Sequence, residues 1–293
     1  MKAAIVLLSR GYPHKEWYGK LIERNNYIYN NFNSKLEKQY PLIIFHEGNI
    51  APEHQQFIID GSKNDDVRFV NIAADFAWPE SIPLTSVQDP GFHLGYRLMC
   101  KFNCYHIWDY VKDFDYIFRI DEDTYIGNLN YDVFKYMDDN KLDYLVGRMC
   151  EETHPLTNTT IPAVAHALLG NRWTVDMYDQ TELWVPYSNL YMARVGLFLQ
   201  SEVQDFLRKI TSNPRFLINR WGDHVVMGIV LKAFSSKDKV SYIKDFEYMH
   251  GSHNCISKDG RALEGILSPH EAEVFNLVLS GKQPEHYIAR ESV

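Results

Sequence analysis

Two aspartates separated by one residue follow a short apolar segment. Residues 116–120 read YIFRI, and Asp121, Glu122 and Asp123 come directly after them. An apolar run of this length is typical of a strand buried on both faces of a parallel sheet. Residues i and i+2 point to the same side, so Asp121 and Asp123 can converge on a hard divalent cation, which binds a diphosphate leaving group. A turn or helix cap is the competing interpretation.

Three other stretches carry side chains suited to a phosphorylated donor. Arg97 and Lys101 stand four residues apart on an expected helix, where they either meet a phosphate or form a solvated charged face. Asp223 in RWGD precedes an apolar segment, so it either caps a helix or contacts a substrate. His250 and His253 follow an expected strand, and either could complete a metal site, although an isolated histidine is more often structural.

The apolar pattern predicts strands and helices that alternate along the first half. We expect strands at residues 3–8, 41–46, 67–72 and 116–120, and helices at 15–31 and 94–111. Further on, we expect helices at 131–139, 202–210 and 222–234 and strands at 144–148, 189–198 and 240–245, with an irregular polar stretch at 151–187. This order predicts an α/β fold with a mostly parallel, Rossmann-like central sheet flanked by helices. Ligands bind such sheets beyond the carboxyl ends of the strands.

Composition narrows the class of function. The chain has 293 residues, 45% of them hydrophobic and 14% aromatic, which fits either sugar stacking or core filling. A net charge of −8 argues against non-specific binding to nucleic acid or to an anionic membrane. The four cysteines show no metal-type CxxC pair, and no apolar run reaches the ~20 residues of a membrane span. The apolar opening has no cleavage site, so we expect a soluble, cytoplasmic chain.

Five stretches, taken in order, resemble the fungal α-1,2-mannosyltransferase family (the Kre, Mnt and Ktr group, glycosyltransferase family 15). The family's Y-R-x-M-C-R-F is matched by YRLMCKF at 96–102, its Y-x-W-R-V-E-P-D by YIFRIDED at 116–123, and its Y-D-P-F-x-Y-M by YDVFKYM at 131–137. Its R-W-G-D recurs at 220–223, and its strand ending in Y-x-H is similar to YMH at 248–250. Each motif alone is weak, but the shared order over about residues 2–253 is specific.

The resemblance implies one catalytic domain of GT-A fold over residues 1–293. Residues 1–130 would form the nucleotide-sugar-binding half, 131–255 the acceptor-binding half, and 256–293 a C-terminal helical extension. The implied activity is retaining transfer of mannose from GDP-mannose to a glycan or glycoprotein acceptor, with Mn²⁺ (or Mg²⁺) as the cofactor.

The site residues that the resemblance implies fall into three groups. The expected metal ligands are Asp121, Asp123 and His250; the expected donor-site residues are Tyr96, Arg97, Lys101 and Arg119; and the expected catalytic and acceptor-side residues are Tyr191, Arg194 and Asp223.

One stretch departs from the family pattern. Where the family has S-N-F-E-I-A-D, residues 188–194 read SNLYMAR, so Tyr191 replaces the glutamate proposed as nucleophile and Arg194 replaces an aspartate. A covalent glycosyl–carboxylate intermediate therefore lacks its expected residue. Front-face substitution remains available, with the departing phosphate oxygen accepting the proton of the acceptor. Arg194 could instead contact a phosphate or a differently substituted sugar.

The residues leave other functions open. A relative that transfers from a UDP-sugar, or one that binds the donor without turnover, would keep the same motifs. A metal-dependent phosphohydrolase could use the same acids and would release inorganic phosphate. Nucleic-acid binding fits the acidic charge poorly.

Overall fold

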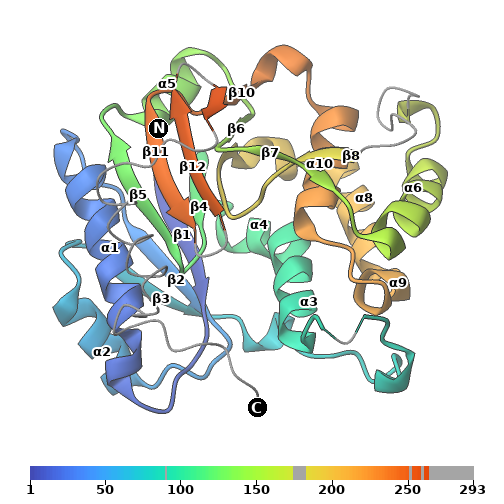
Figure 1. Ribbon diagram of the computed structural model, residues 1–293, viewed down its shortest axis with the longest axis horizontal. Helices are drawn as coiled ribbons and strands as arrows, with labels where there is room; N and C mark the ends of the chain where they lie inside the picture. The colour runs from blue at the N-terminus through green and yellow to red at the C-terminus, as the bar shows by residue number, and fades with distance from the viewer. Residues whose placement is uncertain (90, 174–182, 251–252, 259–260, 264–293) are drawn as a thin grey trace.

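The computed structural model describes residues 1–89, 91–173, 183–250, 253–258 and 261–263, and its main element is a seven-stranded sheet (Figure 1). The strand order is β10-β6-β9-β4-β1-β2-β3. These strands are β1 (Ala3–Ser9), β2 (Leu42–His46), β3 (Val67–Asn71), β4 (Tyr116–Ile120), β6 (Tyr144–Val146), β9 (Leu190–Arg194) and β10 (Val240–Tyr242). Only β9 runs antiparallel to its neighbours β4 and β6, which confirms the predicted mostly parallel sheet.

Both faces of the sheet are covered, which explains the continuous apolar runs of its strands. In β1, Ile5 and Leu7 belong to one hydrophobic cluster while Ala4 and Val6 belong to the other. The first cluster includes side chains of α1 (Gly19–Asn31), α2 (Pro52–Gly61) and α5 (Val133–Asp139). The second includes side chains of α3 (Leu94–Lys101), α8 (Ser201–Ser212) and α10 (Asp223–Phe234). Figure 1 shows α1 and α2 on the left of the sheet and α3, α8 and α10 on its right.

The helix predicted at 94–111 is confirmed, with one irregularity. It comprises α3, a π-helical segment η5 (Phe102–His106) and α4 (Ile107–Tyr110). The π-helical segment follows the lysine of the YRLMCKF motif. Single π-turns of this kind are frequent at functional sites.

A second, antiparallel sheet lies in front of the first (Figure 1). It has the order β13-β12-β11-β5, with β5 (Thr124–Leu129), β11 (Phe246–His250), β12 (His253–Lys258) and β13 (Arg261–Leu263). The predicted helical extension at 256–293 is therefore wrong at its start, where β12 and β13 are strands, and the rest of it lies outside the described residues. A third sheet pairs β7 (Met149–Glu152) with β8 (Leu183–Pro186).

The stretch 151–187 is not irregular as predicted, because it contains the 15-residue helix α6 (Pro155–Leu169). Its buried face is Thr157, Ile161, Ala165 and Leu169, four positions at a strict spacing of four residues. Two of these four side chains are a threonine and an alanine, and Pro162 lies inside the helix. The apolar stripe is therefore too weak for a pattern search, although Pro155 marks the helix start in the usual way.

The remaining elements are short. The strand predicted at 189–198 divides into β9 and α7 (Val195–Phe198), and α9 (Pro214–Ile218) was not predicted, nor was α2. Turns of 3₁₀ helix occur at η1 (Lys15–Tyr18), η2 (Asn33–Lys35), η3 (Ala73–Asp75), η4 (Leu84–Ser86), η6 (Gly170–Arg172) and η8 (Lys237–Lys239). A helix with the length and apolar character needed to cross a membrane is not found in the described ranges.

Candidate active site

The three acids after β4 form the turn that leads into β5. The amide of Thr124 donates to the carbonyl of Asp121 at 3.2 Å, which closes the turn. The middle acid, Glu122, accepts a 2.8 Å hydrogen bond from the hydroxyl of Tyr12. Asp121 and Asp123 instead face a histidine, as the alternation of side chains predicts. The two aspartates thus share one site, and the glutamate between them lies outside it.

His250 completes the cluster from the end of β11. Strand β11 pairs with β5 so that His250 lies opposite Thr124. Its Nε2 is 3.4 Å from Asp121 Oδ2 and 3.2 Å from Asp123 Oδ1, and the imidazole is only 11% exposed. One ligand atom from each of the three residues lies within 4.8 Å of the others, a grouping that could hold a metal ion. The side chain of His253, the alternative ligand, lies outside the described structure.

When no metal is bound, a proton on His250 offsets the negative charge of Asp121 and Asp123. Burial lowers the pKa of His250, but its hydrogen bonds to Asp121 and Asp123 outweigh burial and raise the pKa to about 9. The imidazolium therefore occupies the position of a cation between two carboxylates. A divalent ion would take over that role and release the proton, because metal-ligating histidine is neutral.

Arg119 lies behind the cluster and orients Asp121. Its Nη2 is 2.6 Å from Asp121 Oδ1, its Nη1 donates to the carbonyl of Ser188, and its side chain is 3% exposed. Burial lowers the pKa of Arg119, but the charges of Asp121 and Asp223 outweigh burial and raise it. Both terminal nitrogens are thus engaged within the protein. We interpret Arg119 as a support for the ligand Asp121 rather than as the expected direct contact to the donor.

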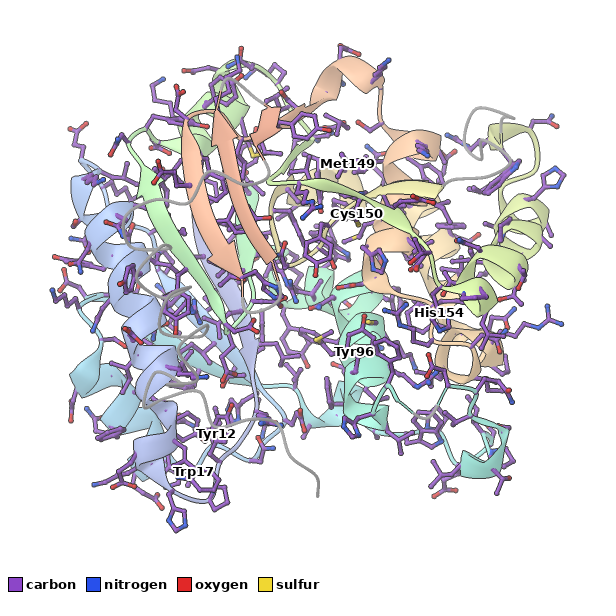
Figure 2. All side chains as sticks on the ribbon, in the orientation of Figure 1. Tyr12, Trp17, Tyr96, Met149, Cys150 and His154 are labelled. Carbon is purple, nitrogen blue, oxygen red and sulfur yellow. The ribbon has the colours of Figure 1, made fainter. Side chains whose placement is uncertain are left out.

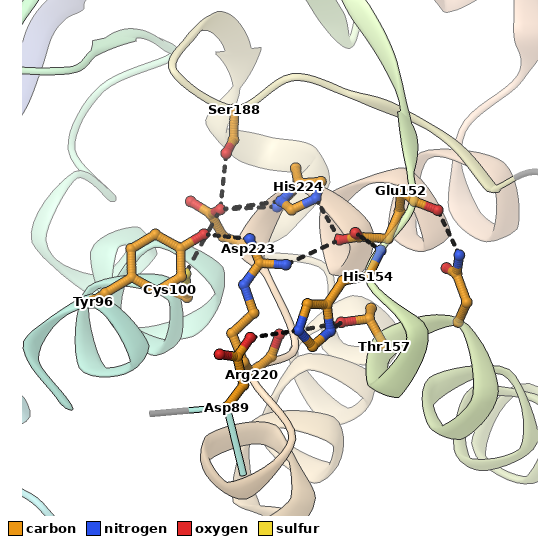
Figure 3. A network of polar contacts seen from close by, with 11 residues as sticks. Asp89, Tyr96, Cys100, Glu152, His154, Thr157, Ser188, Arg220, Asp223 and His224 are labelled. Carbon is orange, nitrogen blue, oxygen red and sulfur yellow. Dashed lines mark hydrogen bonds and ion pairs between the residues drawn. The ribbon is translucent and has the colours of Figure 1, made fainter. Parts of the chain in front are cut away.

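Asp223 is the first residue of α10, and Gly222 is the N-cap. Its Oδ1 accepts hydrogen bonds from Ser188 Oγ at 2.8 Å and from the amide of His224 at 2.9 Å (Figure 3). Oδ2 accepts a hydrogen bond from Asn103 Nδ2 at 3.1 Å. Burial raises the pKa of Asp223, but hydrogen bonding from His224 and the charge of Arg119 outweigh burial and lower it to about 2. Asp223 is therefore a buried carboxylate that stays ionised.

Tyr191 is completely buried, with 0% exposure, on β9 beside Arg119 on β4. Its ring stacks on that of Tyr144 with centroids 5.0 Å apart. Its hydroxyl has no hydrogen-bond partner among the described residues, and burial raises its pKa. Arg194, at the end of the same strand, forms a 2.5 Å ion pair with Asp143. We interpret both side chains as parts of the framework, since neither is free in this structure to contact a sugar as expected.

The expected donor-site residues of α3 separate into different environments. Arg97 is 1% exposed, and its guanidinium donates to five backbone carbonyls, those of Gln88, Asp89, Phe92, Leu217 and Ile218. Such a guanidinium has no donor left for a phosphate, so Arg97 joins the loop at 88–92 and the C-terminal end of α9 to α3. Lys101 is half-buried near Asp75; burial lowers its pKa more than the charge of Asp75 raises it. These two cations therefore do not form the expected common phosphate site.

Tyr96 lies on the side of α3 that faces α6, in the same part of the molecule as His154 (Figure 2). Its hydroxyl accepts a 3.4 Å hydrogen bond from Arg220 Nη2, and the Arg220 guanidinium lies 4.0 Å from the centroid of Phe92. Arg220 also reaches Glu152 Oε2 at 3.6 Å. Tyr96 is thus connected to the Asp223 region and not to the cluster of Asp121, Asp123 and His250.

Pattern analysis missed Glu152, His224, Ser188 and Asn103. His224 Nε2 is 2.8 Å from Glu152 Oε2, although 72 residues separate the two in the sequence. No local signal marks such a pair, because Glu152 lies on β7 and His224 on α10. Asp223 and the neighbouring His224 are the part of this group that the RWGD motif could have indicated.

Comparison with known proteins identifies the family. The sequence profile described as glycolipid 2-alpha-mannosyltransferase matches residues 1–264. The chain belongs to this family. Its relatives include the glycolipid 2-alpha-mannosyltransferase of Saccharomyces cerevisiae, 24% identical over 283 residues, which cover 87% of this chain and 62% of that protein. O-glycoside alpha-1,2-mannosyltransferase homolog 3 of Schizosaccharomyces pombe is 28% identical over 236 residues, 69% of this chain and 62% of that protein.

Solved structures of mannan-synthesising or mannosyl-transferring enzymes share the fold of this chain. The mannosyltransferase Ktr4p from S. cerevisiae superposes with a TM-score of 0.71 at 19% identity, over 97% of this chain and 82% of that chain. Core-mannan synthase A from Aspergillus fumigatus, in an Mn/GDP form, has a TM-score of 0.71 at 19% identity, over 91% of this chain and 81% of that chain. The predicted GT-A fold is confirmed. The chain spans 62% of the length of each of the two relatives named above.

Proposed function

We propose that this chain is a metal-dependent glycosyltransferase that moves mannose from GDP-mannose to a glycan acceptor with retention of configuration. Membership of the glycolipid 2-alpha-mannosyltransferase family supports the reaction class. The observation that carries the proposal is the convergence of Asp121, Asp123 and His250 at the carboxyl end of β4. Ktr4p has been solved in complex with GDP, and the core-mannan synthase A structure is an Mn/GDP form, which supports GDP-mannose as the donor and manganese as the metal.

The three side chains fit a divalent cation. Two carboxylates and one imidazole provide oxygen and nitrogen donors, and His250 is already held in place by strand pairing. When bound, the ion would bind the diphosphate of the donor and stabilise the charge that develops on it. Arg119 would keep Asp121 in its ligating orientation, as partners behind metal ligands commonly do.

The burial of Tyr191 bears on how retention would be achieved. A neutral, completely buried tyrosine stands where the related enzymes keep a glutamate, so this position offers no carboxylate to form a glycosyl intermediate. We favour front-face transfer. The acceptor oxygen forms its bond to the anomeric carbon as the bond from that carbon to the diphosphate oxygen breaks, and the acceptor proton moves to the departing phosphate oxygen. Asp223, ionised and beside Ser188, would orient the acceptor.

A donor-binding protein without turnover is the second candidate, and the same tyrosine favours it. Thermal unfolding with a panel of nucleotide sugars tests donor binding for both candidates. We expect GDP-mannose with Mn²⁺ to raise the melting temperature, since ligand at one hundred times its Kd stabilises by about 2.7 kcal/mol. Chelation of the metal should abolish the shift. If no nucleotide sugar stabilises the protein in the presence of metal, the donor assignment is wrong. If a nucleotide sugar does stabilise it, an assay of sugar transfer to an acceptor separates the transferase from the donor-binding protein.

A further inference from the structure

The buried histidine His224 lies between two carboxylates, those of Glu152 and Asp223. His224 Nε2 is 2.8 Å from Glu152 Oε2, and its Nδ1 is 3.8 Å from Asp223 Oδ1 (Figure 3). The side chains of His224, Glu152 and Asp223 are 11%, 5% and 4% exposed, respectively. Nε2 is within hydrogen-bonding distance of Glu152, while Nδ1 faces Asp223 at a distance that suits an ion pair with a protonated ring. The ring is therefore placed to separate two negative charges that would otherwise repel each other in a site with little water.

The backbone is shaped to receive this ring. A Cβ atom on Gly222 would lie 2.3 Å from His224 Cε1 and 2.5 Å from Nδ1, distances at which atoms cannot coexist. The imidazole thus folds back over the N-cap of its own helix, where any side chain would displace it. His224 is also the second residue of α10, a position where the helix dipole disfavours a cation. The two carboxylates must overcome that effect.

Glu152 has partners of its own that fix its position. Its Oε1 accepts a 2.7 Å hydrogen bond from the amide of His154, and its Oε2 faces both His224 and Arg220, the latter at 3.6 Å. Arg220 is the other charged group facing this carboxylate, and it lies in a left-handed backbone conformation with φ of 57°. Glu152 therefore connects β7 to the residues that precede α10.

The two oxygens of Asp223 have different hydrogen-bond partners. Oδ1 accepts from Ser188 and from the His224 amide, and Oδ2 accepts from Asn103. A carboxylate oxygen has two lone pairs, so Oδ2 retains capacity for one more donor such as a sugar hydroxyl. His224 faces Oδ1, so Oδ2 is the oxygen that keeps this capacity.

We propose that His224, held as a cation between Asp223 and Glu152, is a positioning residue that fixes the Asp223 carboxylate for a hydroxyl of the sugar acceptor. Glu152 positions His224 in turn. The inference rests on the proposed function for the nature of the ligand, while the charged bridge itself does not depend on it. The direction of the pKa changes agrees with the bridge. Burial lowers the pKa of His224, but its contacts with Asp223 and Glu152 outweigh burial and raise it. Burial raises the pKa of Glu152, but its contact with His224, together with the His154 amide and Arg220, outweighs burial and lowers it.

Two conservative variants separate the charge from the packing. Glu152→Gln keeps the shape and a hydrogen-bond acceptor but removes the charge opposite His224. His224→Gln keeps a donor and removes the cation. His166→Gln on the exposed surface of α6 is the matched control, because His166 has no place in this network.

The first readout is an NMR pH titration of the imidazole of His224, assigned by its absence in His224→Gln, in metal-free protein. We expect His224 to remain protonated above the ordinary histidine range. Glu152→Gln should lower its titration midpoint by about one to two pH units, the usual effect of losing a close opposite charge. A midpoint at the ordinary value in the wild type, or one unmoved by Glu152→Gln, would overturn the bridge.

The second readout is transfer kinetics with metal and donor saturating. We expect His224→Gln to raise the KM for the acceptor about ten-fold or more, a loss on the scale of one charge-assisted hydrogen bond, with donor KM unchanged. As the pH is raised, Glu152→Gln should lose activity at a lower pH than the wild type, because its His224 loses the proton earlier. Unchanged acceptor KM in His224→Gln overturns the positioning role. A wild-type protein without transfer contradicts the proposed function and the positioning role together, whereas the titration still decides the bridge.

Discussion

The guanidinium of Arg119 lies 2.6 Å from Oδ1 of Asp121 and is almost fully buried. The other oxygen of Asp121 faces His250. One carboxylate therefore serves two purposes, as a counter-ion for a buried cation and as a candidate metal ligand. Removing Asp121 would leave the cation uncompensated, so loss of activity in Asp121→Ala would not by itself identify a metal ligand.

Asp123→Asn is the cleaner test of the metal site. Asp123 faces the cluster from an exposed turn and is 43% exposed, so its replacement should leave folding intact. We expect Mn²⁺ affinity to fall about ten-fold or more when one of the three side-chain ligands is weakened, a loss of at least about 1.4 kcal/mol. Calorimetric titration with Mn²⁺ and Mg²⁺ measures this. The exposed Asp139→Asn is the control, and equal affinities in both variants would exclude Asp123 as a ligand.

Arg97 should govern stability and not donor affinity. Arg97→Lys keeps the charge but cannot reach five carbonyls, so several buried acceptors lose their donor. We expect a loss of about 3 kcal/mol or more in the free energy of unfolding, because each unsatisfied buried group costs about 1–3 kcal/mol. Urea unfolding measures it, with the exposed Arg208→Lys for comparison. A stable variant with weakened donor binding would instead support a phosphate contact.

The Asp223 carboxylate contributes to the free energy of unfolding by an amount that depends on pH. Its pKa of about 2 in the folded protein lies below the ordinary value of 3.8, so its contribution is present above pH 3.8 and disappears as the pH falls through 2. The lowered pKa corresponds to about 2 kcal/mol. We expect Asp223→Asn to be less stable than the wild type at pH 5 and the difference to shrink toward pH 2. A difference that is constant with pH would contradict the lowered pKa.

Tyr191→Phe tests whether the buried hydroxyl takes part in the reaction. The hydroxyl has no partner among the described side chains, so its removal should not lower the free energy of unfolding and should raise it by up to about 1–3 kcal/mol, the cost of a buried polar group without a partner. We expect the transfer rate to stay within about two-fold, since no transition-state interaction is lost. A rate that falls by orders of magnitude in a folded variant would show that Tyr191 acts on the substrate.

The short-range sequence pattern predicted the sheet and the convergence of Asp121 and Asp123. Strand β4 and the acids after it were recognisable because burial on both faces leaves a continuous apolar run, and the alternation of side chains already placed Asp121 and Asp123 together. The meeting with His250 required the pairing of β5 with β11, which joins segments more than a hundred residues apart. The residues alone left His250 and His253 as alternatives, and the family resemblance favoured His250.

Other side chains could not be placed from the sequence because their environment decides their role. Arg97 and Lys101 share a helix face in principle, yet the loop at 88–92 and the end of α9 enclose Arg97. Glu152 and His224 form an ion pair through the third sheet and α10, whose proximity has no sequence signal. Helix α6 was missed because its buried stripe includes Thr157 and Ala165.

The most direct test is a transfer reaction with GDP-mannose, a mannoside acceptor and Mn²⁺, with the anomeric configuration of the product read by NMR. We predict an α-linked mannoside formed by the wild type, no product after chelation of the metal, and strongly reduced product with Asp123→Asn. Product that forms equally well without metal, or release of inorganic phosphate in place of a mannoside, would contradict a metal-dependent mannosyltransferase.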